Sequence, residues 1–406
     1  MKVAVIGGGA AGFFSAIAVK QHHPEAVVIL FEKAKKVLSK VKISGGGRCN
    51  VTNGCTSIKE LATAYPRGGK ALKKAFKTFH TKHTMEWFEK RGVALMTQED
   101  NCVFPVSQDS QSIIDCLLKE TRHKNITVAT GQGIQQLNPL EDGKIELTFA
   151  KADHAPQIFD KVIVATGGSP TRKGLHWLEY LGHQIEDPVP SLFTFNMPQE
   201  PIRKLMGIVA EKALVSVQGT KLRTDGPLLI THWGMSGPAI LKSSAFGARL
   251  LSESGYKFNA QINWVGVVNN AAVLEALQEI VQQHPQKQLA NYRPYLLPER
   301  LWHFLLEKAE LPLQKKWNEL GKKGLHKLTT ILTNDTYEVS GKTTFKEEFV
   351  TCGGVSLESI DMRTMQSKVC PNLYFCGEVM DIDGITGGYN FQAAWTTGFI
   401  AGKLLD

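Results

Sequence analysis

The hydrophobic pattern begins with a strand, a turn and a helix. Residues 3–6 form a short apolar run, residues 7–12 are rich in glycine, and residues 13–22 are mostly apolar over the length of a helix. A second apolar run covers residues 27–31. Uninterrupted apolar strands are typical of a parallel sheet that is covered on both faces. We therefore predict a βαβ unit at the start of the chain.

An apolar run followed by glycine occurs twice more. Residues 161–165 precede Thr166 and Gly167, and residues 373–376 precede Gly377. Three strand-to-glycine junctions therefore lie in the first and last parts of the chain. We predict one discontinuous nucleotide-binding domain that is assembled from both ends.

The middle of the chain has a different pattern. Between residues 191 and 266, alternating segments such as 213–217 and 228–231 are bounded by Gly and Pro, which indicates antiparallel strands in a barrel or sandwich. Between residues 267 and 332 the period becomes helical and predicts three helices.

Composition excludes several classes of protein. The 406 residues are 43% hydrophobic and 21% charged, and no apolar run approaches the roughly 18 residues of a membrane-spanning helix. The seven cysteines form no Cys-x-x-Cys pair, which argues against a disulfide scaffold and favours a reducing cytoplasm. Zinc-ligand spacing is absent, so we predict no metal site.

The formal net charge of +9 is compatible with nucleic acid, an anionic membrane or acidic small molecules. The densest basic stretch covers residues 67–90. Its lysines are Lys70, Lys73, Lys74, Lys77 and Lys82. Leu72, Phe76, Phe79, His83 and Trp87 recur at helical spacing in the same stretch. We predict one amphipathic helix with its aromatic side chains buried and its lysines in solvent. An RNA-binding face is the alternative interpretation.

Gly7, Gly9 and Gly12 form the pattern G-x-G-x-x-G between the predicted strand and helix. Glycines in this position allow a tight turn and a close approach of the backbone to a pyrophosphate, which the helix N-terminus attracts. Glu32 ends the second apolar strand, where a carboxylate accepts hydrogen bonds from a ribose diol. This carboxylate favours FAD or NAD over NADP, because it repels a 2′-phosphate.

Two further segments favour FAD over NAD. The sequence Ser-Gly-Gly-Gly-Arg-Cys-Asn at residues 44–50 can wrap closely around a ligand, with Arg48 as a cation or planar stacking partner. The run from Gly377 to Asn390 precedes a last helix at residues 391–404. The N-terminus of that helix suits the negative charge of a reduced flavin ring.

These motifs resemble the BaiN and aminoacetone-oxidase-like family of FAD-dependent oxidoreductases, which are related to the glutathione-reductase type of FAD domain. The resemblance rests most on Ser-Gly-Gly-Gly-Arg-Cys-Asn at residues 44–50 and Gly-Gly-Tyr-Asn at residues 387–390, and it spans the whole chain. It implies non-covalent FAD. The positions that match the family's cofactor-binding motifs are Gly7, Gly9, Ala10, Ala11, Gly12, Glu32, Lys33, Lys40, Ser44, Arg48, Asn50, Thr166, Gly167, Gly377, Glu378, Gly388, Tyr389 and Asn390.

The predicted fold class is α/β, with a three-layer, Rossmann-like FAD-binding domain whose sheet is mostly parallel, an inserted antiparallel β-barrel and a small helical insert. We expect the FAD-binding domain at residues 1–190 and 346–406. The barrel is expected at residues 191–266 and 333–345, and the helical insert at residues 267–332.

The chain has no second G-x-G-x-x-G, so it has no recognisable separate NAD(P)H domain. Reducing equivalents then come from transiently bound NAD(P)H or directly from an oxidisable substrate. His232 is one candidate acid or base, because it follows a strand in the expected insert and histidine titrates near neutral pH. Tyr389, within the flavin motif, is the other.

The leading functional hypothesis is an FAD-dependent oxidoreductase. It would transfer hydride between the flavin and either NAD(P)H or a small amine or enone-like substrate, with O₂ or an organic acceptor. The alternatives are a flavin enzyme that modifies RNA and a flavin-binding protein without catalysis. We expect a small-molecule partner in preference to nucleic acid, and the oligomeric state stays open.

Overall fold

In the computed structural model, the apolar runs of both chain ends lie side by side in one sheet. The parallel strands are β1 (Lys2–Ile6), β2 (Val27–Glu32), β6 (Thr127–Thr130), β10 (Lys161–Val164) and β22 (Leu373–Phe375). Their order is β6-β2-β1-β10-β22, and every neighbouring pair is parallel. The short strands β20 (Ile360–Asp361) and β21 (Gln366–Ser367) extend this sheet in antiparallel fashion. The predicted parallel sheet is thus confirmed, and β6 is a further strand that was not predicted.

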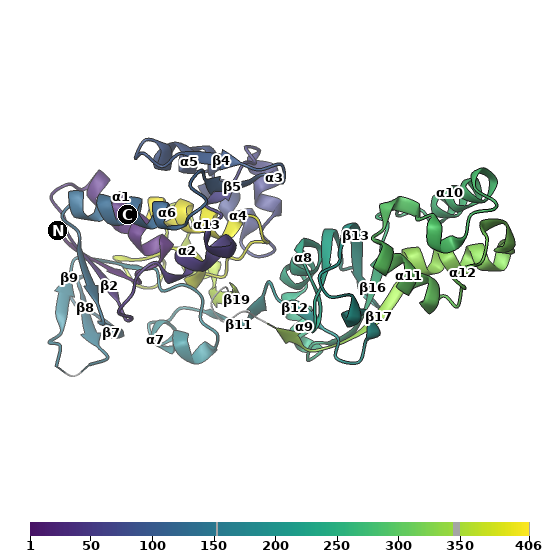
Figure 1. Ribbon diagram of the computed structural model, residues 1–406. Helices are drawn as coiled ribbons and strands as arrows, with labels where there is room; N and C mark the ends of the chain where they lie inside the picture. The colour runs from purple at the N-terminus through teal and green to yellow at the C-terminus, as the bar shows by residue number, and fades with distance from the viewer. Residues whose placement is uncertain (152, 344–349, 406) are drawn as a thin grey trace. The chain divides into compact units, whose positions relative to one another are not determined.

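The structure describes residues 1–151, 153–343 and 350–405, and these form two compact units (Figure 1). Unit 1 is Met1–Ser191 with Phe345–Asp406, and unit 2 is Leu192–Thr344. The domain border predicted at residue 345 lies outside the described residues. The division into three domains stays a prediction.

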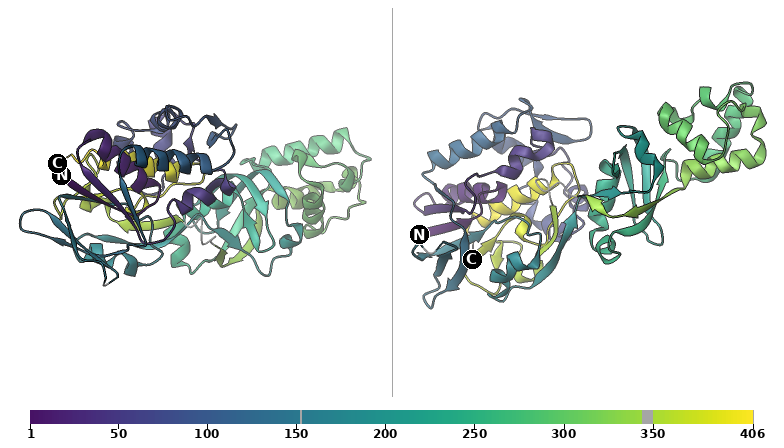
Figure 2. Two further views of the ribbon diagram at one scale, coloured as in Figure 1. Left: turned by 60° about the vertical axis from the view of Figure 1, so that its left-hand side comes forward. Right: turned by 60° about the horizontal axis from the view of Figure 1, so that its bottom comes forward.

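Helices cover one face of the sheet of unit 1. α1 (Ala10–His22) packs against α13 (Tyr389–Ala401) and α6 (Gln111–His123), as Figures 1 and 2 show. Phe14 on α1 and Trp395 on α13 have ring centroids 5.2 Å apart. The first and last helices of the chain therefore share one core.

A small antiparallel sheet covers the other face. It consists of β7 (Ile134–Pro139), β8 (Ile145–Phe149) and β9 (Gln157–Phe159). Phe31 of β2 contacts Phe149 and Phe159 at centroid distances of 5.5 and 5.8 Å. These contacts complete the three layers.

The lysine-rich stretch forms two helices and not the single helix predicted. α4 (Gly69–Ala75) ends before the turn that leads into α5 (Thr81–Glu89). Leu72, Phe76 and Trp87 are buried as predicted. His80 is the N-cap of α5 and starts a new helix within the expected one, so the periodicity correctly predicted the buried face but not the break.

The remaining elements of unit 1 connect these layers. They are α2 (Ser39–Ile43), β3 (Thr52–Asn53), α3 (Ile58–Thr63), β4 (Leu95–Thr97), β5 (Cys102–Pro105), α7 (His176–Glu179), β11 (Ile185–Ser191) and β19 (Val350–Val355). β11 and β19 form an antiparallel pair, and Ser191 lies opposite Val350.

Unit 2 combines an antiparallel sheet with helices. The strands are β12 (Thr194–Asn196), β13 (Val209–Val217), β14 (Arg223–Ile230), β15 (Gly234–Ser236), β16 (Lys257–Asn263), β17 (Asp335–Ser340) and β18 (Lys342–Thr343). The helices are α8 (Pro238–Phe246), α9 (Ala248–Glu253), α10 (Asn270–Gln283), α11 (Glu299–Lys308) and α12 (Gly321–Thr333). β12 and β17, near opposite ends of the sheet order, contact each other, so the sheet curls. One core joins strand residues such as Val215 to helix residues such as Leu305.

Within residues 1–151, 153–343 and 350–405, none of the helices has the length and apolar character that crossing a membrane requires.

Gly402 tests the packing of the first helix against the last. A Cβ at Gly402 would lie 2.5 Å from Cβ of Ala18 and 2.7 Å from the carbonyl oxygen of Ser15. Its backbone is helical, where Gly→Ala alone stabilises by roughly 0.5–1 kcal/mol. We expect Gly402→Ala to destabilise the protein by about 1–3 kcal/mol, because the overpacking outweighs this gain. Chemical denaturation measures the effect, and an unchanged or raised midpoint would contradict it.

Candidate cofactor-binding site

The glycines of the first turn differ in how much space surrounds them. A Cβ at Gly7 would lie 2.3 Å from the carbonyl oxygen of Ala165, and one at Gly12 would lie 1.8 Å from the carbonyl oxygen of Gly7. At Gly9, in contrast, a Cβ would meet no atom within 4 Å. Gly7 and Gly12 therefore hold strand and helix together, while Gly9 leaves room for a ligand to approach the backbone.

The helix after this turn begins earlier than predicted. α1 starts at Ala10, so Ala10, Ala11 and Gly12 belong to its first turn and not to the preceding loop. No side chain caps this end of the helix. Its first backbone N–H groups and the positive end of its dipole therefore suit a phosphate.

Glu32 lies beside this turn at the end of β2. Its carboxylate accepts the N–H of Gly8 at 2.7 Å and the N–H of Ala34 at 2.8 Å. These bonds fix the carboxylate against the glycine turn, which is the position that recognition of a ribose requires. Lys33, the next residue, is exposed.

Lys40 and Glu378 meet although 338 positions separate them. The Nζ of Lys40 lies 2.9 Å from Oε2 of Glu378, and the N–H of Thr351 donates to Oε1 of Glu378 at 2.8 Å. Sequence analysis placed Lys40 and Glu378 in the site but assigned no role to Thr351. The Oγ1 of Thr351 is buried without a hydrogen-bond partner among the described residues.

Residues 44–50 form a tight, left-handed loop. Gly45, Gly46 and Gly47 have φ values of 57°, 69° and 85°, a region that glycine adopts without strain. The hydroxyl of Ser44 donates to the carbonyl of Val41 at 2.9 Å. The backbone N–H groups of this loop are candidates for binding the predicted cofactor.

Arg48 follows the loop and stacks on an aromatic ring. Its guanidinium lies 4.2 Å from the ring centroid of Phe104, and its Nε donates to the carbonyl of Gly45 at 3.2 Å. The side chain is therefore a planar group held in a fixed position.

The C-terminal motif packs against the N-terminal motifs. A Cβ at Gly377 would lie 2.7 Å from Cβ of Ala11, and one at Gly388 would lie 2.7 Å from Oδ1 of Asn50. That Oδ1 is buried without a partner among the described residues. Gly388 has a φ of 85° and is the N-cap of α13, whose first turn has no side-chain cap. An acceptor oxygen and a helix N-terminus are thus adjacent.

Tyr389 and Asn390 begin α13 and have different roles in the loop. The side chain of Asn390 exchanges two hydrogen bonds with the backbone of Gly384, at 2.8 and 2.9 Å. The carbonyl of Tyr389 accepts the hydroxyl of Tyr65 at 2.7 Å. Burial raises the pKa of the Tyr389 phenol to about 12, so it keeps its proton at neutral pH.

A buried ion pair that was not predicted ties this loop to the segment before α4. Arg67 donates from Nε to Oδ1 of Asp383 at 2.6 Å, and its Nη2 contacts Oδ2 of the same carboxylate. Ser191 donates to Oδ2 at 2.7 Å. Asp383 is fully buried, and burial raises its pKa against the opposing effect of Arg67. No motif in the sequence singled out Arg67.

The remaining residues of interest are the predicted Thr166, Gly167 and His232, together with Cys49 of the loop at residues 44–50. Thr166 and Gly167 follow β10, and a Cβ at Gly167 would meet no atom within 4 Å. His232 is exposed in unit 2, and its backbone carbonyl accepts a bond from Arg203 at 3.4 Å. Cys49 is buried in the core of unit 1, and burial raises the pKa of its thiol to about 12.

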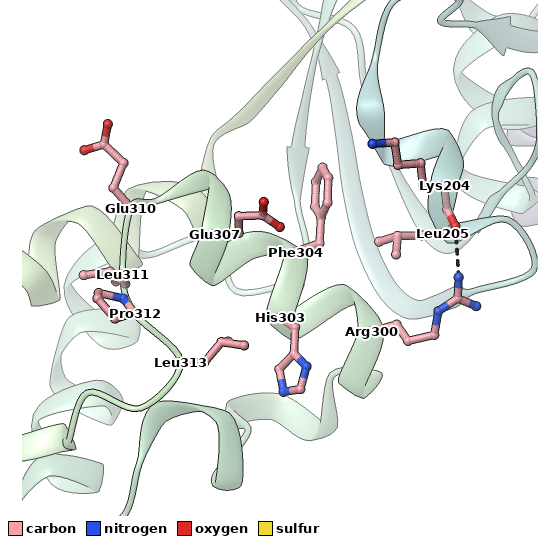
Figure 3. A pocket seen from close by; sticks show the side chains of 10 residues that line it. All are labelled: Lys204, Leu205, Arg300, His303, Phe304, Glu307, Glu310, Leu311, Pro312 and Leu313. Atoms are coloured by element: carbon pink, nitrogen blue, oxygen red, sulfur yellow. Dashed lines mark hydrogen bonds between the residues drawn. The ribbon is translucent and has the colours of Figure 1, made fainter.

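Unit 2 contains a separate open cavity of about 570 Å³ (Figure 3). It lies along α11, where Arg300 donates to the carbonyl of Lys204 at 2.9 Å, and Leu205 and Phe304 give it an apolar part. None of the residues that line it was predicted to bind a cofactor.

The predicted cofactor residues gather at the carboxyl ends of β1, β2, β10 and β22, where dinucleotides bind to such sheets. Three features fit an extended phosphate-containing cofactor: the open backbone at Gly9, the helix N-termini of α1 and α13 that no side chain caps, and the Asn50 oxygen, which has no partner among the described residues.

The family described as HI0933-like protein Rossmann domain matches residues 1–404. The chain belongs to this family. The resemblance inferred from the motifs is thereby confirmed, and the protein is a flavin-dependent oxidoreductase with a Rossmann-type FAD domain.

Curated relatives of this HI0933-like protein match it along almost its whole length. The 3-dehydro-bile acid delta(4,6)-reductase of Clostridium scindens is 25% identical over 99% of the chain and 98% of the relative. The ribosomal RNA dihydrouridine synthase of Escherichia coli is 28% identical over 97% of the chain and 95% of the relative.

Solved structures share the fold of the HI0933-like chain. The 3-ketosteroid Δ4-(5α)-dehydrogenase of Rhodococcus jostii superposes with a TM-score of 0.51 at 12% identity, covering 98% of this chain and 96% of that one. The 3-ketosteroid Δ1-dehydrogenase of Sterolibacterium denitrificans has a TM-score of 0.52 at 11% identity, with 98% of both chains covered. At these identities the likeness shows the fold alone.

Glu32 provides the first test of the site. We expect Glu32→Ala to weaken FAD binding by about tenfold or more, because hydrogen bonds to a charged group contribute about 1.5–3 kcal/mol. Glu32→Gln keeps one acceptor oxygen and is expected to have a smaller effect. Titration of the FAD-free protein by flavin fluorescence measures both. Equal affinity in Glu32→Ala and the parent would remove Glu32 from the site.

Arg67 provides the second test. We expect Arg67→Met to destabilise unit 1 by about 3–5 kcal/mol, because it leaves the buried Asp383 carboxylate without its partner. The double variant Arg67→Met, Asp383→Asn removes both charges and is expected to recover part of this loss. Thermal unfolding measures the three proteins, and a double variant no more stable than Arg67→Met would argue against the pair.

Proposed function

We propose that this protein uses FAD and NAD(P)H to reduce a carbon–carbon double bond that is conjugated to a carbonyl group. The observation that carries the proposal is the pair of full-length relatives. One is named for reduction of a conjugated bile-acid ring, and the other for conversion of uridine to dihydrouridine. Uridine has a C5=C6 double bond conjugated to its C4 carbonyl, so both names describe the same bond change on different scaffolds.

In this reaction the residues of the site would bind and orient FAD and donate a proton to the substrate. Gly9, the first turn of α1 and Glu32 would hold the adenosine diphosphate half of FAD, and the N-terminus of α13 would bind the flavin half. When bound, FAD supplies the two-electron chemistry, which takes a hydride from NAD(P)H and delivers it to the β carbon of the substrate. The net reaction consumes one substrate, one NAD(P)H and one proton, and yields the saturated product and NAD(P)⁺.

Tyr389 is the first candidate for the proton that the α carbon receives. Its hydroxyl is protonated at neutral pH, as in any tyrosine, and burial raises its pKa further, to about 12. His232, exposed in unit 2, is the second candidate. A chain that reduces enones has no need for a reactive thiol, and the burial of Cys49 agrees with that.

Amine oxidation with O₂ as acceptor is the competing reaction for a small-molecule substrate. It differs in the direction of electron flow at the substrate, because an amine would reduce the flavin and an enone would oxidise it. A non-catalytic flavin protein would do neither.

Anaerobic titration separates these possibilities. We expect NADH or NADPH to bleach the flavin absorbance, and a stoichiometric amount of an α,β-unsaturated ketone to restore it. The matched saturated ketone serves as control and should leave the flavin reduced. A flavin that amines bleach directly, and that only O₂ reoxidises, would overturn the proposal.

Tyr389→Phe and His232→Gln then assign the proton donor. The variant that lacks the donor should bleach with NAD(P)H at the normal rate but reoxidise with the enone roughly 10²- to 10⁴-fold more slowly, the usual contribution of general acid catalysis. Equal rates of both half-reactions in a variant would exclude that residue.

A further inference from the structure

A long stretch of unit 1 carries positive charge without any acidic residue. From residue 61 to residue 85 the chain contains Arg67 and five lysines but no Asp or Glu. The five lysines are Lys70, Lys73, Lys74, Lys77 and Lys82. We call this group the lysine face.

The lysine face is exposed to solvent along α4, the turn that follows it and the start of α5. Lys70, Lys73, Lys74 and Lys77 recur at i, i+3, i+4 and i+7, and all five lysines are exposed. The opposite side of the same turns is buried in the core of unit 1 through Leu72, Phe76 and Phe79. The apolar side is therefore occupied and cannot insert into a lipid bilayer.

No lysine of the face has an ion-pair partner among the residues that the structure describes. Nearby cations differ in this respect, because Lys42 pairs with Asp109 and Lys90 with Glu86. Within α4, Lys70 and Lys74 are like charges at i, i+4, and such a pair destabilises a helix. A bound polyanion would relieve this repulsion.

The lysine face follows a segment that contacts residues 380–388, the loop before α13, which we call the flavin loop because it leads into the predicted flavin motif. Immediately before α4, Ala64 accepts the N–H of Ile385 at 2.9 Å, and the hydroxyl of Tyr65 donates to the carbonyl of Tyr389. Arg67 pairs with Asp383. The segment that leads into the lysine face is thus bonded to the middle of the loop that precedes α13 and to the first residue of α13.

Two imidazole rings continue the face at the start of α5. His80 and His83 are half-buried, and their ring centroids lie 4.3 Å apart. Planar side chains beside a basic surface are the groups on which unpaired bases stack.

We propose that the lysine face is a docking surface for the phosphodiester backbone of single-stranded RNA, and that a base of the bound strand enters the flavin site. This inference rests on the proposed function, since it names uridine in RNA as the conjugated substrate. It reverses the preference for a small-molecule partner, because the lysines have no ion-pair partner within the described part of the chain and the segment before them is bonded to the flavin loop.

The test compares two triple variants of the FAD-loaded protein. Lys73→Gln, Lys74→Gln, Lys77→Gln removes three charges from the lysine face. Lys221→Gln, Lys322→Gln, Lys323→Gln removes three exposed lysines from unit 2 and gives the same net charge. The probe is a fluorescein-labelled, uridine-rich RNA of about 12 nucleotides, and anisotropy gives its Kd over a range of salt concentrations.

We expect the logarithm of affinity to fall with the logarithm of salt concentration with a slope of roughly −3 to −4 for the parent, since each lysine contributes about −0.7. The lysine-face variant should reduce this slope by about 2, whereas the unit 2 variant should match the parent. Equal losses in both variants would show an effect of net charge alone and overturn the proposal, as would salt-independent binding.

Two further measurements separate this proposal from other outcomes. Vesicles of phosphatidylserine that bind more tightly than the RNA, with the same lysine dependence, would overturn RNA as the partner. Turnover of the small enone is measured in the same variants and should be unchanged. Enone turnover without RNA binding would overturn the docking surface and leave the proposed function standing. RNA binding without reduction of either the enone or the uridines of the RNA would overturn the proposed function, and with it the entry of a base into the flavin site.

Discussion

The contact between α1 and α13 joins two ends of the chain that are almost 400 residues apart. It depends on glycines, because a Cβ at Gly398 would lie 2.9 Å from the carbonyl oxygen of Ala11 and one at Gly402 would lie 2.5 Å from Cβ of Ala18. This close approach brings Gly377 against the first turn of α1 and sets both helix N-termini at one edge of the sheet. Every other element of the cofactor site is arranged around that edge.

The Arg67–Asp383 pair has a similar role at the other end of the site. A buried carboxylate is costly unless it is paired and hydrogen-bonded, and here Arg67 and Ser191 together supply the partners. The pair ties three segments to one point, which are the approach to α4, the flavin loop and the end of β11. Stability and the shape of the loop therefore depend on the same few atoms.

The strands and glycine turns could be predicted from the sequence because their signals are local. Val3 to Ile6 is continuously apolar, and Gly7, Gly9 and Gly12 keep a fixed spacing. β6 was missed because its residues, Thr127–Thr130, alternate only weakly and are stabilised by pairing with β2. The break between α4 and α5 was missed because Leu72, Phe76, Phe79, His83 and Trp87 keep a helical period across it, while the capping by His80 and His83 depends on geometry. Arg67 carried no signal, since its partner lies 316 positions away.

The order of the parallel strands has a consequence for how the protein is made on the ribosome. β10 pairs on one side with β1 and on the other with β22, which is synthesised about 210 residues after β10. At roughly 10 residues per second, one edge of the nascent sheet stays open for about 20 seconds. The predicted flavin end of the site, from Gly377 to Asn390, is synthesised later still. The cofactor site is therefore complete only after this segment has been made, and the half-built domain must avoid edge-to-edge association until then.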